Sequence, residues 1–240
     1  MTATTMIVTM MTRSHPPVKY RNELKIQLNP ADEIILRSRL RRVFSPDKHA
    51  DSHGSYRVSS LYFDTPDDLA LREKISGLAV RDKYRIRYYN QNLDFIRLEK
   101  KSKNGSVSTK RQVRLSLEQV KRILKMDIGW LLDSDEPLLV ELYTKMRHTG
   151  LRPTSITRYD RSAYRHEAGN VRLTIDRNLH ISWDPSDFLR PAQALFPTGD
   201  RPILEVKYDD FLPDIVRQVV GLSNRRSGAY SKYAASRRFD

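Results

Sequence analysis

Basic side chains recur at every second position in several short stretches of this sequence, a spacing that could hold an anionic ligand such as a phosphate chain. In RDKYRIRYYN, Lys83, Arg85 and Arg87 alternate with aromatic and aliphatic residues. Residues 81–114 contain eleven Lys or Arg and three Asp or Glu, so they carry +8 of the chain's +14. Residues two apart on a β-strand share a face, where like charges repel. An anionic partner is therefore expected to neutralise this face.

The alternation returns in four more stretches, at residues 20–28, 94–103, 170–179 and 201–210. Each of them predicts a strand with one ionic and one largely apolar face. A solvated charged face is the plain alternative that spacing alone leaves open. If the sheet closes with helices on its apolar outer side, however, the ionic faces line an interior that can hold a phosphate chain.

Helices with recognisable start signals separate the predicted strands, which gives an α+β fold with helices outside. Ser116 and Gln119 form a capping-box pattern, and Gly150 is a plausible helix end. The stretch 155–170 predicts a strand and a hairpin turn, in a register that places Arg161 on the same face of the sheet as Arg172. For the strand around residues 59–66, the sequence leaves open which face points inward. The predicted helices cover residues 31–44, with Ile34, Ile35, Leu36 and Leu40 as a buried stripe, and residues 67–76, 117–126, 135–150, 212–222 and 227–236.

Composition limits the classes of protein to consider. The chain has 240 residues, 39% of them hydrophobic, which suffices for the core of one domain. With no Cys, disulfides, thiolate nucleophiles and cysteine metal sites are excluded. No apolar run reaches the roughly 20 residues that span a bilayer. We expect a flexible leader over residues 1–17, one domain over residues 18–240 and a cytoplasmic location.

Taken together, the motifs resemble the VTC domain, the polyphosphate polymerase module of the vacuolar transporter chaperone, within the triphosphate tunnel metalloenzymes. The resemblance covers roughly residues 20–235. It implies an eight-stranded antiparallel β tunnel with helices packed on the outside, and transfer of the ATP γ-phosphate onto a growing polyphosphate chain. The segments that carry it are YRNELK, SSLYFDTPDD, REKISG followed by RDKYRIRYYN, RLEKKSKNG, RYDRSAYR, VRLTIDRNL, PILEVKYDDFLP and AYSKYAAS, in that order.

The resemblance also implies roles for individual residues. Basic residues that correspond to phosphate-binding and catalytic positions of the family are Lys25, Arg85, Arg87, Lys101, Arg161, Arg172 and Lys232. Further substrate-binding positions, with Lys83 and Lys207 added from the strand alternation, are Lys74, Lys83, Lys110, Tyr159, Lys207 and Ser231.

Glu205 resembles the family's metal-binding glutamate, which implies Mn²⁺ or Mg²⁺ as cofactor, with phosphate oxygens completing the metal's shell. Glu23 and Glu99 are further metal candidates. Each of them could equally be an ion-pair partner of the lysine two residues later.

Three other functions compete with an ATP-dependent polymerase. A tripolyphosphatase or a non-catalytic polyphosphate-binding subunit would use the same lining. Arg21, which stands in place of the first Glu of the superfamily's Glu-x-Glu-x-Lys start, favours the polymerase branch over triphosphatases. A nucleic-acid binder is less favoured because carboxylates among the cations would repel nucleic-acid phosphates. The expected partners are ATP and inorganic polyphosphate, and a membrane or accessory partner encoded separately is left open.

Overall fold

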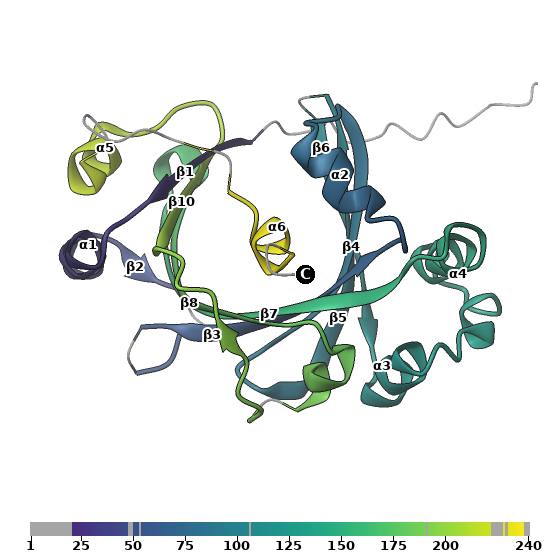
Figure 1. Cartoon of the computed structure of the whole chain (residues 1–240). Coiled ribbons are helices and arrows are strands. Elements are labelled where there is room, and N and C mark those ends of the chain that lie inside the picture. The colour runs from purple at the N-terminus through teal and green to yellow at the C-terminus, as the bar shows by residue number, and fades with distance from the viewer. Residues whose placement is uncertain are drawn as a thin grey trace, which may run out of the picture.

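An antiparallel sheet curls around a central space in the computed structural model, with helices packed around it (Figure 1). The structure describes residues 21–47, 50–52, 54–105, 107–190, 192–221, 228 and 230–237. The predicted leader lies outside the described residues. The strands are β1 (Asn22–Gln27), β2 (Ser45–Pro46), β3 (Tyr56–Asp64), β4 (Val80–Tyr89), β5 (Asn92–Asn104), β6 (Val107–Leu115), β7 (Arg152–His166), β8 (Val171–Ser182), β9 (Phe196–Pro197) and β10 (Ile203–Tyr208).

Eight of these strands form the main path of the sheet, in the order β1-β10-β8-β7-β3-β4-β5-β6. The two short strands β2 and β9 add to β7 and β8. The eight strands are antiparallel to their neighbours, which confirms the predicted α+β class and strand count. Within the described residues β1 and β6 end the path without pairing, so the sheet is a curled half-barrel with a seam.

Two apolar cores attach helices to the outer face of the sheet. One joins β3, β4 and β5 to α3 (Leu117–Leu124) and α4 (Pro137–Thr149) through residues such as Leu98, Ile123 and Leu142. The other joins β1, β8 and β10 to α1 (Pro30–Val43) and α5 (Asp214–Val220) through residues such as Leu40 and Val206. This outer packing turns the ionic strand faces toward the concave side. None of the described helices is both long and apolar enough to cross a bilayer.

The helix termini agree with the local signals in the sequence. Ser116 and Gln119 form a complete capping box at α3, and Gly150 ends α4 in the left-handed conformation, which glycine adopts without steric cost. α2 (Leu69–Ile75) begins later than predicted, because the Asp64 carboxylate accepts hydrogen bonds from the backbone N–H groups of Ala70 and Leu71.

The predicted buried stripe of α1 is partly wrong. Leu36 and Leu40 are buried, but Ile34 and Ile35 are 65% and 49% exposed. The helix instead buries Glu33, one turn before Leu36, and the Glu33 carboxylate accepts a hydrogen bond from Arg37. The rotation of a helix about its axis is set by its tertiary contacts, and here they select one of two plausible apolar stripes.

α6 (Lys232–Ser236) departs from the arrangement of the other helices, because it lies on the concave side of the sheet (Figure 1). Polar contacts hold it there. The Ser236 and Ser155 hydroxyl oxygens are 2.9 Å apart, and the indole N–H of Trp183 donates to the Ser236 carbonyl at 2.9 Å. Tyr233 donates to the buried carboxylate of Asp64. The C-terminal segment thereby contributes side chains to the interior.

Candidate active site

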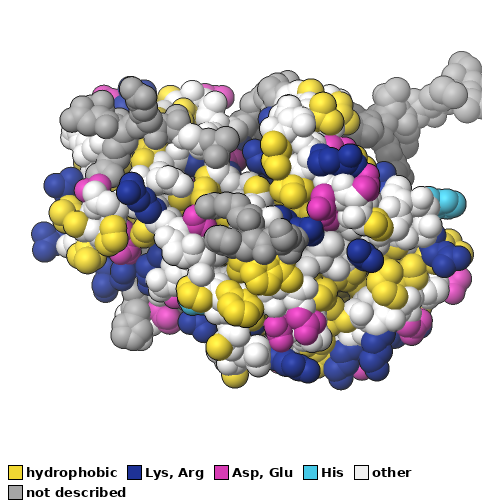
Figure 2. All heavy atoms as spheres, in the orientation of Figure 1, with side chains coloured by type: hydrophobic (Ala, Val, Ile, Leu, Met, Phe, Trp, Pro, Cys, Tyr) yellow, Lys and Arg dark blue, Asp and Glu magenta, His cyan; other side chains and the backbone are white. Residues whose placement is uncertain are grey.

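The concave face gathers cationic side chains from strands far apart in the sequence. Outward-facing Lys and Arg are also present over α1 and near α3 (Figure 2), so only part of the +14 charge faces inward. Inside, the cations form groups, each arranged around a buried carboxylate or aromatic rings.

Glu99 on β5 lies between cations of the two neighbouring strands. Its carboxylate is 2.6 Å from the Arg85 guanidinium on β4 and 2.5 Å from the Lys110 ammonium on β6. Burial alone would raise the pKa of Glu99, but the charges of Arg85, Arg87 and Lys110 lower it to about 2. Glu99 is thus ionised at neutral pH. Its described partners are on adjacent strands, and Lys101, two residues later, is not among them.

Lys83 on β4 has aromatic neighbours. Its ammonium lies 4.6 Å from the ring centre of Tyr233 and 5.5 Å from that of Tyr62. Burial lowers the pKa of Lys83 to about 8. Burial opposes ionisation of Tyr62, but the charges of Arg85, Arg87 and Lys83 outweigh it and lower the pKa of Tyr62 to about 7.

Lys101 on β5 and Lys74 on α2 are within electrostatic reach of β1, at the opposite edge of the sheet. Partial desolvation lowers the pKa of Lys101, which is also sensitive to Glu23, Lys207 and Lys25 on β1 and β10. Partial desolvation likewise lowers the pKa of Lys74 on α2, with further lowering by Arg81 and Lys25. The charges of β1, α2 and β5 therefore act on one another across the space enclosed by the sheet.

Two glutamates converge on Lys25 at the other edge of the sheet. The Lys25 ammonium is 2.7 Å from Glu23 and 3.8 Å from Glu205, and Glu205 is 2.7 Å from Lys207. Burial would raise the pKa of Glu205, but Lys207, Arg161 and Lys25 hold it well below its usual range. The Lys25 ammonium also donates to the Tyr230 carbonyl at 3.3 Å, which ties β1 to the C-terminal segment.

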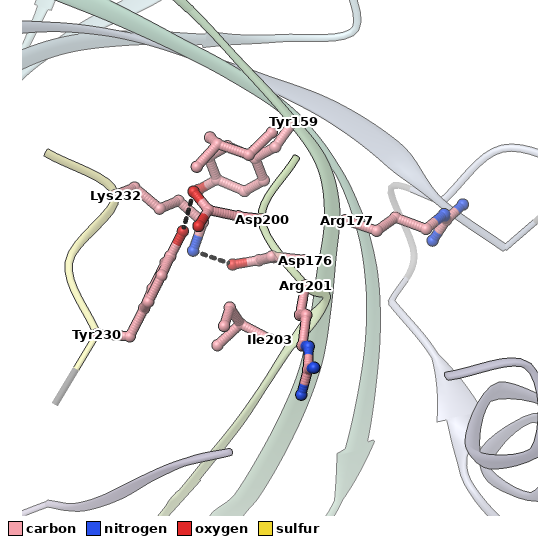
Figure 3. A pocket seen from close by; sticks show the side chains of 9 residues that line it. Tyr159, Asp176, Arg177, Asp200, Arg201, Ile203, Tyr230 and Lys232 are labelled. Carbon is pink, nitrogen blue, oxygen red and sulfur yellow. Dashed lines mark hydrogen bonds and ion pairs between the residues drawn. The ribbon is translucent and has the colours of Figure 1, made fainter. Parts of the chain in front are cut away.

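Asp176 on β8 is the centre of a third group. Arg161 binds its two carboxylate oxygens at 2.6 and 2.7 Å, and the Lys232 ammonium on α6 lies 2.5 Å away. Burial would raise the pKa of Asp176, but Arg161 and Lys232 lower it to about 2. Figure 3 shows Asp176 and Lys232 in a pocket that Tyr159 and Tyr230 also line.

The remaining predicted residues lie near these groups. Arg87 donates to the Ser60 hydroxyl at 2.9 Å and to the phenol oxygen of Tyr159 at 3.4 Å. Arg172 reaches the Tyr56 hydroxyl at 3.1 Å and Asp47 at 3.3 Å. These contacts show that the Tyr56–Ser60 side of β3 faces inward, which the sequence left ambiguous. Ser231 caps α6 by accepting from the backbone N–H of Ala234 at 3.3 Å.

Sequence reasoning missed Asp176 as a site residue. The signal was available, because Asp176 stands at an alternate position from Arg172 and so shares its strand face. Tyr56 and Tyr62 were missed as well, and for them the signal was weaker because the inward face of β3 was ambiguous.

A divalent metal fits this site only with ligands from outside the protein. Among the described residues no three Asp, Glu or His side chains are close enough to enclose an ion. Glu23 and Glu205 are the best pair, since both approach the Lys25 ammonium, whereas Glu99 is engaged by Arg85 and Lys110. Hard divalent cations prefer carboxylate oxygens, and Mg²⁺ is commonly held by one or two carboxylates plus substrate phosphates.

A curled sheet whose polar interior carries such groups defines a protein suited to a multiply charged anion. The chain belongs to the VTC domain family, whose model matches residues 20–239. This confirms the resemblance seen in the sequence, and it supports an enzyme with an activity related to polyphosphate or triphosphate. No curated protein sequence matches the chain.

Solved structures resemble this chain at low sequence identity, and one of them, with a TM-score above 0.5, has the same fold. A putative adenylate cyclase from Bacillus halodurans is 12% identical, with a TM-score of 0.53 over 93% of this chain and 98% of that one. A Pyrococcus horikoshii OT3 protein is 15% identical, with a TM-score of 0.42 over 84% and 85%. The Mimivirus capping enzyme triphosphatase is 8% identical, with a TM-score of 0.40 over 84% and 90%.

Proposed function

We propose that this protein is a polyphosphate polymerase that transfers the γ-phosphate of ATP onto a growing inorganic polyphosphate chain. The observation that carries the proposal is the convergence of inward-facing cations from β1, β4, β5, β6, β7, β8, β10 and α6 on one concave face. Membership of the VTC family supports the same reading.

The arrangement of the cations suits a linear string of phosphates. Arg forks bind phosphate oxygens in pairs, and Lys supplies compact point charges. The carboxylates Glu99, Glu205 and Asp176 each contact two of the cations, so these six cations are held without large uncompensated repulsion. An incoming phosphate chain would compete for cations that these carboxylates already orient.

Phosphoryl transfer mainly requires alignment of donor and acceptor and stabilisation of charge on the transferring group. In this proposal Arg85, Arg161 and Arg172 hold phosphates of the donor and acceptor in line, and Lys25, Lys101 and Lys232 offset the charge that spreads over the transferring group. The attacking oxygen belongs to the terminal phosphate of the existing chain, which is already ionised near neutral pH. No dedicated general base is needed.

Glu205, with Glu23 beside it, would hold Mn²⁺ or Mg²⁺ together with phosphate oxygens. When bound, such a cation supplies charge neutralisation at the donor phosphates and polarises the transferring phosphorus. The protein's own part is to keep Glu205 ionised, which Lys207, Arg161 and Lys25 do by lowering its pKa.

The deciding experiment incubates the purified chain with ATP and Mn²⁺ and measures long-chain polyphosphate and free phosphate together. Growth of polyphosphate that depends on both supports the polymerase. Free phosphate released from tripolyphosphate without chain growth identifies a hydrolase instead. Tight binding of polyphosphate with neither product identifies a non-catalytic binding subunit, and both of these outcomes reject the proposal.

A further inference from the structure

Three arginines lie side by side across the strands β4, β5 and β6. Arg87 is paired with Arg97 across β4 and β5, and Arg97 is paired with Arg114 across β5 and β6. Arg97 is two residues from Glu99, so it shares the concave face with the Arg85–Glu99 pair. Adjacent strands are about 4.8 Å apart, which makes this set a continuous arginine row.

The arginine row lacks the carboxylate that the neighbouring row has. Two residues away on the same face of the three strands, Arg85, Glu99 and Gln112 are paired in the same way. Glu99 neutralises Arg85 there. Within the described residues neither Arg97 nor Arg114 forms a salt bridge. Like charges directly opposite each other destabilise a sheet, so the row costs stability unless an anion binds it.

The two outer arginines are oriented by contacts other than ion pairs. The Arg97 guanidinium stacks over the Phe95 ring at 4.2 Å, and that of Arg114 lies 5.5 Å from the same ring. Arg114 also donates to the Asp94 carbonyl at 2.8 Å. In the described part of the chain the Arg97 side chain donates no hydrogen bond, so its fork is positioned with donors left for a ligand.

Exposure to solvent increases along the row. Arg87 is buried at 6% exposure, Arg97 is half-buried and Arg114 is exposed. The row therefore leads from the interior site, where Arg87 contacts Tyr159, to open solvent at the edge strand β6.

We propose that the arginine row Arg87–Arg97–Arg114 is an outer binding track for the part of a linear phosphate chain that extends beyond the interior site. This inference rests on the proposed function, since it takes the interior ligand to be polyphosphate. A phosphate chain fits better than single-stranded nucleic acid, because Arg97 covers a face of Phe95 on which a base would have to stack.

The test compares two double variants of the full chain that remove the same charge. Arg97→Gln with Arg114→Gln changes the outer part of the row, and Arg39→Gln with Arg42→Gln changes two exposed arginines on α1 as the matched control. Dissociation constants are measured for long-chain polyphosphate, tripolyphosphate and a single-stranded oligonucleotide at several salt concentrations.

We expect the row variant to bind long-chain polyphosphate roughly tenfold more weakly, with a salt slope smaller by about two, because two phosphate contacts are lost. Its affinity for tripolyphosphate should stay within about twofold, since that ligand is short enough for the interior site. Its melting temperature should not fall below that of the control, because it removes repulsion. If its melting temperature does fall below that of the control, the double variant Arg97→Lys with Arg114→Lys, which keeps both charges, should still retain most of the binding.

Equal loss in the row and control variants would overturn the inference, and so would an equal loss for tripolyphosphate or a preference of the row for the oligonucleotide. Long-chain binding that depends on the row, in a wild-type chain that makes no polymer, would reject the polymerase but retain the track. A wild-type chain that binds no polyphosphate would reject both.

Discussion

The concave face has two walls of different electrostatic character. The wall of β4, β5 and β6, here called the cationic wall, places basic residues in directly paired rows such as Lys83–Lys101–Lys110, and Glu99 is its inward-facing carboxylate among the described residues. The wall of β1, β10 and β8, here called the mixed wall, alternates the two signs of charge, with Glu23 opposite Lys207 and Lys25 opposite Glu205.

The difference suggests a division of labour within one sheet. Paired cations without acids are unfavourable in an empty sheet and favourable with a bound polyanion, so the cationic wall is suited to binding. Paired acids and bases are self-neutralising, and their carboxylates can exchange a lysine for a metal, so the mixed wall is suited to holding the metal for phosphoryl transfer.

The largest effect is expected from Glu205→Gln on the mixed wall. Loss of the carboxylate removes several kcal/mol of transition-state stabilisation that a metal would supply, so synthesis should fall more than about a thousandfold while the fold persists. Polyphosphate formation from ATP and Mn²⁺ measures this, with the exposed Glu118→Gln on α3 as control. Full activity in Glu205→Gln would reject the metal assignment.

Glu99→Gln is the matched change on the cationic wall. It frees Arg85 and Lys110 from their carboxylate, so polyphosphate should bind at least as tightly and synthesis should continue. If Glu99→Gln stops synthesis and Glu205→Gln does not, the roles of the two walls are reversed.

Asp176→Asn should have the largest effect on stability. It leaves the buried charges of Arg161 and Lys232 without their common partner, and breaking a buried ion pair costs about 3–5 kcal/mol. Urea unfolding at pH 7 measures the loss. Asp160→Asn, which affects a more exposed pair with Arg57, is the control and should cost about 1 kcal/mol or less. Equal costs for the two variants would contradict the buried role of Asp176.

Acid should lower the stability of the fold through both walls, because it protonates a buried, ion-paired carboxylate in each. The folded pKa values of Asp176 and Glu99 are about 2, below the unfolded values of about 3.9 and 4.3. Each carboxylate therefore stabilises the fold at pH values above its unfolded pKa. This contribution to the free energy of unfolding, about 2–3 kcal/mol, is lost as pH falls from about 5 toward 2. Urea unfolding as a function of pH should show this loss, reduced in Asp176→Asn. A flat profile between pH 5 and 2.5 would count against both ion pairs.

The smallest effect should come from Lys83→Arg. Because the pKa of Lys83 is about 8, its ammonium loses its proton as pH rises above that value, and the cationic wall loses one charge. Wild-type affinity for tripolyphosphate should fall about five- to tenfold on this account, whereas an arginine stays charged and should leave only the smaller fall caused by ionisation of Tyr62, whose pKa is about 7. Binding titrations from pH 7 to about 9.5 test this, with Lys121→Arg on α3 as control. Identical profiles for all three proteins would show that Lys83 does not contact the ligand.

Much of the site could be predicted from local pattern. The alternation in β4 correctly grouped Lys83, Arg85 and Arg87 on one face, because side chains on a strand alternate whatever the fold. The ion partners could not be predicted in the same way. Glu99 pairs with Arg85 and Lys110, which are fourteen and eleven residues away, through the registers of two strand pairs.

By itself, the sequence determined which side chains share a strand face, where α3 begins and α4 ends, and that the interior face would be strongly basic. These properties follow from backbone geometry and from hydrogen bonds within a few residues. Only the tertiary structure decided that Ile34 and Ile35 face solvent, that α6 enters the concave side, and that Asp176 joins Arg161 to Lys232. Those outcomes depend on strand register and on packing between distant segments, where several arrangements have nearly equal local energy and the contacts of the whole molecule select one.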